Sequence, residues 1–401
     1  MSTRFARRMS GVRASSIREM LKATEQPGII SFAGGLPAPE LFPVDDIRSA
    51  TERVFRETAA SALQYGPTEG CSLLRELLAE RMLKRAVVCS TDDLLVTTGS
   101  QQSLDLIGKI FLDAGDCVLT ESPTYLAAIQ AFQAYEPRFI TVPTDEEGLI
   151  PEALPELIER EQPKLLYTIP NFQNPTGVTL TAERRRILYS IAARYGLIVV
   201  EDDPYGMLRY SGTAIPSIKS LDTDGIVIYL STVSKTIAPG LRVGWAVAKP
   251  EIRRALTIVK QAVDLHTSSL DQRIVYRYLS DFDIDVHIER IRRSYGERYS
   301  VMNSRLEECM PAGFTWTHPE GGMFLWVTCP EELNTCELMP GALERKVLFV
   351  PGQDFFPDGA SRRFMRLNFS NASLAQIGEG IGRLADVCAA AVRNLPVAQR
   401  C

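Results

Sequence analysis

Short apolar runs and longer amphipathic stretches alternate along residues 94–247. Seven runs have strand length: Leu94–Thr98, Cys117–Thr120, Arg138–Val142, Lys164–Ile169, Leu197–Glu201, Ile226–Leu230 and Leu241–Val247. The intervals between them have helical spacing, as in the series Leu104, Ile107, Ile110 and Phe111. This alternation predicts an α/β fold, in which helices cover both faces of a mostly parallel sheet.

The pattern changes on either side of this region. Before it, helices are expected at Ser15–Ala23, Asp45–Thr58 and Cys71–Leu83, with an exposed loop at Gln64–Gly70. From about residue 290, a helix is followed by the short strands Phe314–Thr317, Met323–Val327, Val347–Val350 and Phe364–Phe369, and by a final helix. We expect three parts: an N-terminal arm and helix (1–45) that joins the small domain, a large domain (46–289) and a C-terminal small α+β domain (290–401).

Composition excludes several classes of function. The net charge of −5 and the lack of a long cationic run argue against nucleic-acid binding. No apolar stretch approaches the roughly 20 residues that cross a bilayer. The three histidines are widely separated, which argues against a His-based metal site or a Ser-His-Asp triad.

The cysteines and the N-terminus bear on location. The eight cysteines have no Cys-x-x-Cys spacing, and several lie in apolar runs, so buried thiols in a reducing compartment are expected. Arg4, Arg7, Arg8 and Arg13 all precede any acidic residue, as in transit peptides, but no signal-peptide apolar core is present. We predict an ordered N-terminal arm and a cytoplasmic protein.

Residues suited to chemistry follow the strands at their carboxyl ends, where open parallel sheets bind ligands. After Ile226–Leu230, Lys235 is flanked by hydroxyls and followed by Arg242. Lys235 could form an imine with an aldehyde cofactor, while Thr232, Ser234 and Arg242 hold its phosphate. Judged alone, a solvated loop lysine is the commoner explanation.

Three further turns have two readings each. The turn at 99–102 opens a helix, so Ser100 and the helix amides suit a phosphate, although an ordinary N-cap is equally common. Tyr125 could stack on a planar ring or be a core aromatic. Asn174 could donate to a ring oxygen or simply complete a turn.

Two charged residues complete the set. Asp202, at a strand end, could keep a pyridine nitrogen protonated or could cap the following turn. Arg366 lies between apolar strand residues, so it must be paired or line a cavity, because unpaired burial is costly.

Taken together, these elements have a specific order and spacing: Ser100-Gln101, Tyr125, Asn174-Pro175, Asp202-x-x-Tyr205, Thr232-x-Ser234-Lys235, Arg242 and Arg366-x-Asn368. They resemble the pyridoxal-phosphate-dependent aminotransferases of fold type I, class I/II, over almost the whole chain. The segments Ser31–Pro37 and Tyr65–Gly70, together with Arg18, resemble the branch containing 2-aminoadipate and kynurenine aminotransferases. The resemblance implies a three-layer, mostly parallel seven-stranded sheet with a smaller α+β domain.

The resemblance also implies roles around the cofactor, pyridoxal 5′-phosphate. Lys235 is the expected catalytic residue, which tethers the cofactor and moves the substrate proton. Asp202 pairs with the ring nitrogen, Asn174 and Tyr205 bond the phenolic oxygen, and Tyr125 stacks on the ring. The expected phosphate ligands are Ser100, Gln101, Thr232, Ser234, Arg242 and, from a second subunit, Tyr65. Thr232 departs from the usual serine but keeps the hydroxyl.

On the substrate side, the resemblance implies that Arg366 and Asn174 bind the α-carboxylate. Arg18 and Gly35 are expected near the substrate side chain, so the N-terminal arm contributes to the substrate pocket. Arg18 could pair with a distal carboxylate, swing aside for aromatic or aliphatic side chains, or be only a surface arginine.

The expected function is transfer of an amino group from an L-amino acid (2-aminoadipate, aromatic or branched-chain) to a 2-oxo acid such as 2-oxoglutarate, by a homodimer with shared active sites. A decarboxylase, lyase or oxidase with the same anchors is the alternative, which the Arg366 match disfavours. A non-catalytic effector-sensing module, like the aminotransferase-like half of certain bacterial regulators, is a further alternative. It is disfavoured because no helix-turn-helix precedes the first sheet strand.

Overall fold

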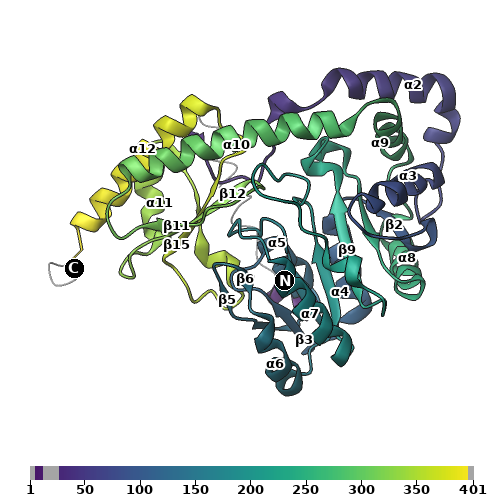
Figure 1. The fold of residues 1–401 in the computed structure, drawn as a ribbon, viewed down its shortest axis with the longest axis horizontal. Helices are drawn as coiled ribbons and strands as arrows, with labels where there is room; N and C mark the ends of the chain where they lie inside the picture. Colours follow the sequence, from purple (N-terminus) through teal and green to yellow (C-terminus); the bar gives the residue numbers. More distant parts are fainter. Residues whose placement is uncertain (1–4, 12–26, 396–401) are drawn as a thin grey trace.

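The computed structural model describes residues 5–11 and 27–395. The predicted helix Ser15–Ala23, and Arg18 within it, fall outside these residues. Two parts lie side by side, a larger one around a seven-stranded sheet and a smaller one around a four-stranded sheet (Figure 1).

The large sheet has the strand order β2-β10-β9-β8-β7-β3-β4. Its strands are β2 (Leu94–Thr97), β3 (Cys117–Thr120), β4 (Arg138–Thr141), β7 (Leu165–Thr168), β8 (Ile198–Asp202), β9 (Val227–Thr232) and β10 (Gly244–Val247). Only β10 is antiparallel to its neighbours, so the predicted seven-stranded, mostly parallel sheet is confirmed.

One predicted strand is too long at its start. Residues 241–243 were expected in the last strand, yet β10 begins at Gly244. Pro239–Leu241 form a short 3-10 helix, and Arg242 has φ +50°, in the left-handed region. Extended pairing cannot pass through that backbone, and the bend places Arg242 at the end of the sheet.

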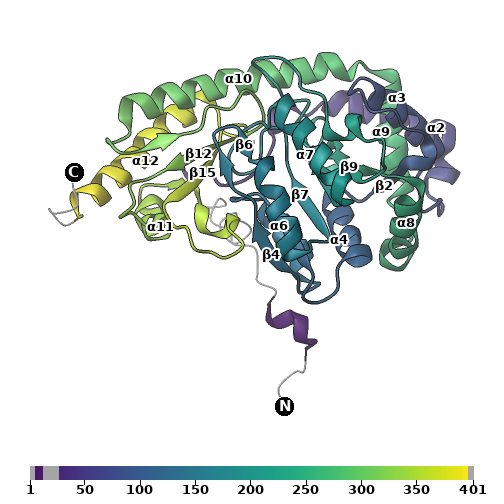
Figure 2. The same ribbon diagram turned by 60° about the horizontal axis from the view of Figure 1, so that its bottom comes forward.

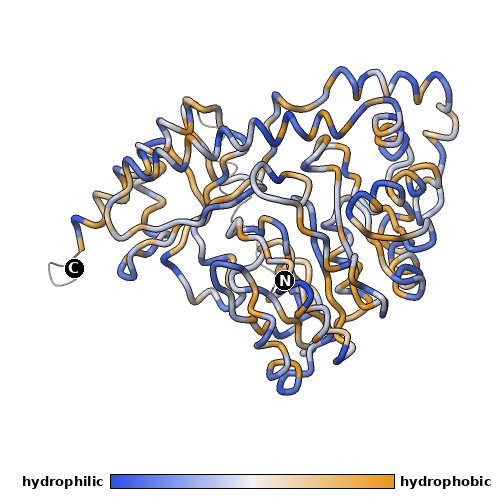
Figure 3. The backbone as a smooth tube through the Cα atoms, viewed as in Figure 1, coloured by the Kyte–Doolittle hydropathy of each residue, from blue (hydrophilic) through white to orange (hydrophobic). Residues whose placement is uncertain are grey.

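Helices cover both faces of the large sheet because alternate strand residues point to opposite sides. In β9, Ile228 packs in a core with helices α4, α5 and α8, whereas Val227 packs in a second core with α6 and α7. The apolar character of the central strands is visible in the hydropathy colouring of Figure 3. These helices are α4 (Ser100–Phe111), α5 (Leu126–Gln133), α6 (Leu154–Glu161), α7 (Ala182–Tyr195) and α8 (Pro250–Asp264).

A third group of helices packs at the β2–β10 side of the sheet. It consists of α2 (Val44–Ala62), α3 (Ser72–Leu83) and α9 (Ser269–Asp281). The first two confirm the helices predicted at 45–58 and 71–83, with α2 longer at its C-terminal end. The predicted loop at 64–70 joins them.

The small part contains the antiparallel sheet β11-β12-β15-β14 and the parallel pair β1-β13. The strands are β11 (Thr315–Trp316), β12 (Phe324–Thr328), β15 (Phe364–Asn368), β14 (Val350–Pro351), β1 (Ile30–Ser31) and β13 (Val347–Leu348). The single strand predicted at 347–350 is therefore divided between two sheets. Strand β1 belongs to the predicted N-terminal arm and pairs with β13. The N-terminal arm therefore forms part of the small part, although it lies at the opposite end of the sequence. Helices α11 (Thr335–Glu344) and α12 (Leu374–Arg393) pack against it.

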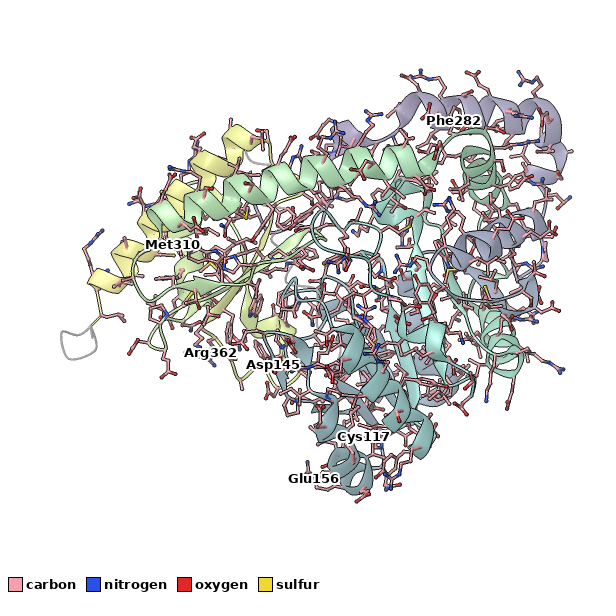
Figure 4. The ribbon with its side chains drawn as sticks, viewed as in Figure 1. Cys117, Asp145, Glu156, Phe282, Met310 and Arg362 are labelled. Carbon is pink, nitrogen blue, oxygen red and sulfur yellow. The ribbon has the colours of Figure 1, made fainter. Side chains whose placement is uncertain are left out.

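One long helix connects the two parts. Helix α10 spans Ile284–Cys309, which at 1.5 Å per residue is roughly 39 Å. Phe282 and Met310, labelled in Figure 4, mark its two ends. The predicted domain boundary at residues 289 and 290 lies inside this helix, and the division into domains stays a prediction.

Two further observations concern the described residues. Within 5–11 and 27–395, no helix has both the length and the apolar character of a membrane span. The seven cysteines in these ranges are all free thiols, three of them buried. Figure 2 shows the short 3-10 helix η1 (Arg7–Ser10) extending away from the sheet.

Candidate active site

A cavity of about 510 Å³ lies at the carboxyl ends of the central strands, between the large and small parts. Twelve of the predicted site residues line it: Gly35, Ser100, Gln101, Tyr125, Asn174, Asp202, Tyr205, Thr232, Ser234, Lys235, Arg242 and Arg366. They come from seven separate stretches of chain. Their arrangement around one cavity is a structural finding, whereas their roles toward a ligand stay predictions.

Lys235 lies at the end of a 3-10 turn (η6, Val233–Lys235) that follows β9 directly. Thr232 caps this turn, because its hydroxyl accepts from the Ser234 amide at 3.1 Å. The Lys235 Nζ donates to the Gly35 carbonyl at 2.8 Å. Burial, and then the charges of Arg366 and Arg242, lower the pKa of Lys235 to about 8. An appreciable neutral fraction near pH 7.5 is what a nucleophile or proton acceptor needs.

At one end of the cavity, groups that suit a phosphate converge. Ser100 begins α4, whose first amides have no partner within the helix, and Ser234 and Thr232 present hydroxyls 2.8 Å apart. The Arg242 guanidinium lies against the turn before α4. A Cβ on Gly99, which has φ +75°, would lie 2.5 Å from Arg242 Nη2, so only glycine allows this approach. Hydroxyls, a helix N-terminus and a guanidinium are together suited to hold an anion.

Asp202 ends strand β8 and is buried. Its Oδ2 accepts from the Tyr167 hydroxyl at 2.8 Å, while its Oδ1 has no partner among the described residues. Burial raises the pKa of Asp202 to about 7 despite the Tyr167 bond, which lowers it. A buried carboxylate oxygen without a donor fits a protonated ring nitrogen, which would supply both the hydrogen bond and the positive charge.

Arg366 of β15 reaches the cavity from the small part and is 1% exposed. Its Nη1 donates to Asn174 Oδ1 at 2.8 Å and its Nη2 to the Ala33 carbonyl at 2.7 Å. The guanidinium lies 4.3 Å from the centre of the Phe324 ring, and Nε has no partner among the described residues. Burial lowers the pKa of Arg366 to about 10, so it stays charged at neutral pH. Arg366 is therefore both paired and lining a cavity, which fits binding of a carboxylate.

The other residues predicted to contact the cofactor ring come from three turns. Asn174 Nδ2 donates to the Tyr205 hydroxyl at 3.4 Å, so these two side chains face one region of the cavity. Tyr125 precedes α5, and Gln101 holds the start of α5 by donating to the Ala127 carbonyl at 3.1 Å. The segment that presents Tyr125 is thus tied to the phosphate end.

Two predicted residues are not among those that line the cavity. Arg18 lies outside the described residues. Tyr65 is 78% exposed on the loop before α3, with its ring 5.8 Å from that of His266.

Other cavity residues were not foreseen. Phe324 and Ile169 add apolar side chains to the lining, and Tyr167, which does not line the cavity, donates its hydroxyl to Asp202 from behind. The one available signal was the hydroxyl of Tyr167 inside an otherwise apolar strand.

Comparisons with known proteins agree with this geometry. The family described as "Aminotransferase class I and II" matches residues 29–384. An aromatic-amino-acid aminotransferase of Thermococcus litoralis is 48% identical over 95% of this chain and 93% of its own. A 2-aminoadipate transaminase of Thermus thermophilus is 45% identical over 96% of both chains.

Among solved structures, a kynurenine aminotransferase of Pyrococcus horikoshii, in complex with PMP, has a TM-score of 0.93 and 45% identity. The match covers 96% of this chain and 97% of that one. The predicted family and fold are therefore confirmed: the chain belongs to the class I and II aminotransferases and is a pyridoxal-phosphate-dependent aminotransferase.

Proposed function

We propose that this enzyme transfers the amino group of aromatic L-amino acids, kynurenine and 2-aminoadipate to a 2-oxo acid such as 2-oxoglutarate. The observation that carries the proposal is the division of the cavity. Arg366 lines the cavity from the small part, with its guanidinium 4.3 Å from the centre of the Phe324 ring, and Ile169 adds a further apolar side chain to the lining. A carboxylate beside an apolar wall suits an amino acid with a large side chain. The names of the similar enzymes support the same range of donors.

The cofactor fits the residues present. Ser100, Gln101, Thr232, Ser234 and Arg242 would hold its phosphate. Tyr125 would stack on the ring, Asp202 would pair with the ring nitrogen, and Asn174 and Tyr205 would bond the phenolic oxygen. When bound, pyridoxal phosphate supplies an aldehyde that reacts with amines and a ring that accepts electrons from the Cα–H bond.

The chain's own residues then orient the substrate and move its proton. A two-fold hydrogen bond between Arg366 and the α-carboxylate fixes rotation about the Cα–N bond and selects which bond at Cα is aligned for cleavage. The Lys235 amine, with its lowered pKa, takes the Cα proton as general base and holds it for return. Desolvation of Lys235 thus serves both attachment and proton transfer.

Substrate range is tested with a panel of donors against 2-oxoglutarate. We expect phenylalanine, kynurenine, 2-aminoadipate and leucine each to yield one glutamate per donor consumed. Release of carbon dioxide, ammonia or hydrogen peroxide in place of glutamate would favour the decarboxylase, lyase or oxidase reading.

The Arg18→Ala variant is expected to lower kcat/KM for 2-aminoadipate about tenfold more than for leucine, because only the former has a distal carboxylate.

The control for Arg18 is Arg7→Ala, which removes another N-terminal arginine whose partner is the surface residue Glu136. It should leave all donors unaffected. An equal loss for 2-aminoadipate, kynurenine and leucine in Arg18→Ala would count against pairing with a distal carboxylate.

We also infer a homodimer in which Tyr65 reaches the phosphate of the second subunit. Tyr65 is 78% exposed, with the exposed Leu63 two residues before it and the exposed Leu265 next to His266, whose ring lies 5.8 Å from that of Tyr65; exposed apolar side chains at such a loop suit an interface with a second subunit. Tyr65→Phe is expected to weaken binding of pyridoxal phosphate about tenfold, the loss of one hydrogen bond to a charged group. Tyr189→Phe removes a surface hydroxyl bonded to Asp224 and is the control. A monomer in sedimentation, or unchanged affinity in Tyr65→Phe, would refute the shared site.

A cytoplasmic location is part of the proposal. It is supported by the free thiols in the described part of the chain, three of which are buried.

A further inference from the structure

An ion pair with a buried ammonium lies beside the turn that begins α4, among residues that do not line the cavity. Lys260 of α8 is completely buried. Its Nζ donates to both carboxylate oxygens of Asp264, at 2.7 and 2.9 Å, and to Gln102 Oε1 at 2.7 Å. Gln102 Nε2 donates in turn to Asp264 Oδ2 at 2.7 Å. The two Asp264 oxygens and Gln102 Oε1 thus give each of the three ammonium protons an acceptor. We call Lys260, Asp264 and Gln102 the Lys260 cluster.

Thr98 forms two hydrogen bonds with the Lys260 cluster. The Thr98 amide donates to Gln102 Oε1 at 2.9 Å, and the Thr98 hydroxyl donates to Asp264 Oδ2 at 2.9 Å. Thr98 is the residue between β2 and Gly99, so both bonds fix the chain immediately before the phosphate-suited turn.

The other side of the turn is held by strand β10. A Cβ on Gly244 would lie 2.8 Å from the carbonyl carbon of Gly99 and from the amide nitrogen of Ser100. The backbone of β10 therefore approaches the turn as closely as glycine permits. With β10 on one side and the Lys260 cluster bonded to Thr98, the amides at 99–100 have little freedom to shift.

A contribution to the stability of the fold does not by itself explain why this charged cluster is present. Burying the Lys260 ammonium costs several kcal/mol, its partner Asp264 is still 26% exposed, and well-packed apolar residues are often as stabilising as a buried charge pair. Burial would raise the pKa of Asp264, but hydrogen bonds from Lys260, Gln102 and Thr98 lower it below its ordinary value. A fully satisfied polar network gives a fixed geometry, which apolar packing between α4 and α8 gives less strictly.

We propose that Lys260, Asp264 and Gln102 are positioning residues that hold the turn at 98–100 in the conformation that binds the phosphate monoester of the cofactor. They act through Thr98 and do not touch the phosphate. The inference rests on the proposed function, because it takes Ser100 and the start of α4 as the phosphate site. It follows that the cluster governs affinity for the phosphorylated cofactor and has little effect on affinity for the same ring without phosphate.

The test compares two ligands in the full-length, cofactor-free protein. In Lys260→Met, the dissociation constant of pyridoxal phosphate is expected to rise about tenfold or more, while that of pyridoxal changes less than about threefold. Both constants are obtained by titration, from the absorbance of the adduct with Lys235. The matched control is Lys109→Met, which breaks an i,i+4 Lys–Asp pair with Asp105 on the surface of α4 and should change neither constant.

Unchanged affinity for pyridoxal phosphate in Lys260→Met overturns the inference. An equal loss for both ligands overturns it too, since a general packing defect would not distinguish them. If Lys260→Met does not fold, Lys260→Met combined with Asp264→Leu removes both charges, and the same selective loss is expected; failure of this variant to fold would make the cluster a folding element and refute the inference. Failure of the unmodified protein to bind pyridoxal phosphate would instead refute the proposed function.

Discussion

Replacing Lys235 with alanine is expected to lower kcat by at least about 10²-fold with every amino donor, the contribution expected of one general acid–base group. Lys235 is the lysine that lines the cavity, and its pKa of about 8 suits it to accept a proton near neutrality. Alanine removes the amine and leaves Gly35, whose carbonyl accepts from Lys235 Nζ, otherwise unchanged. Single-turnover kinetics with phenylalanine measure the loss in the step that contains proton transfer.

Two controls separate loss of chemistry from loss of structure. Borohydride reduction of the unmodified holoenzyme, followed by peptide mapping, should label residue 235, and no other lysine should be labelled in the variant. Lys219→Ala removes another lysine of the large part, one paired with Asp222 and not lining the cavity, and should retain turnover. Near-normal turnover by Lys235→Ala would refute its assignment as the catalytic residue.

The second large effect is expected from Arg366→Leu. Removing one partner of a buried, hydrogen-bonded charge pair costs about 2 kcal/mol or more, which corresponds to at least a roughly 30-fold loss of kcat/KM for phenylalanine. The loss should be specific to substrates with an α-carboxylate. The reacting amine and the aromatic side chain are the same in 2-phenylethylamine, which lacks that carboxylate, so its slow reaction should change by no more than a few-fold.

The ratio of the two substrates is the decisive quantity. Leucine leaves Asn174 Oδ1 and the Ala33 carbonyl without their present donor, so the thermal midpoint is expected to fall as well. Instability alone would lower kcat/KM for both substrates equally and leave their ratio unchanged. An unchanged preference for phenylalanine over 2-phenylethylamine would therefore contradict carboxylate binding by Arg366.

Much of the fold could be predicted because the sheet is buried on both faces. Strands such as β3 and β7 are wholly buried, mostly apolar and separated by helical spacing, so their positions were predicted to within a residue or two. The prediction failed where local backbone geometry outweighed hydrophobic pattern. Leu241 is apolar and was placed in a strand, yet the left-handed Arg242 beside it ends the extended conformation.

The candidate site was predictable for a different reason. Its members lie at strand ends, so a correct strand order brings Asn174, Asp202 and Lys235 to one edge. Side-chain contacts between elements that are far apart in sequence could not be predicted in this way. The hydrogen bond from Tyr167 to Asp202 joins the neighbouring strands β7 and β8. The bond from Lys260 to Gln102 joins helices α8 and α4, which are far apart in sequence. Neither pair has a spacing that the sequence alone reveals.

The long helix α10 has a consequence for how the enzyme fails under heat. Because this one rod reaches from the helices beside β2 to the small sheet, the wall that presents Lys235 and the wall that presents Arg366 are mechanically joined. The helix adds to direct links between the two parts, such as the bond from Arg366 to Asn174, so its unwinding is expected to loosen the two walls relative to each other. A helix that contributes no side chain to the lining is thus expected to affect how long the cavity keeps its shape on heating.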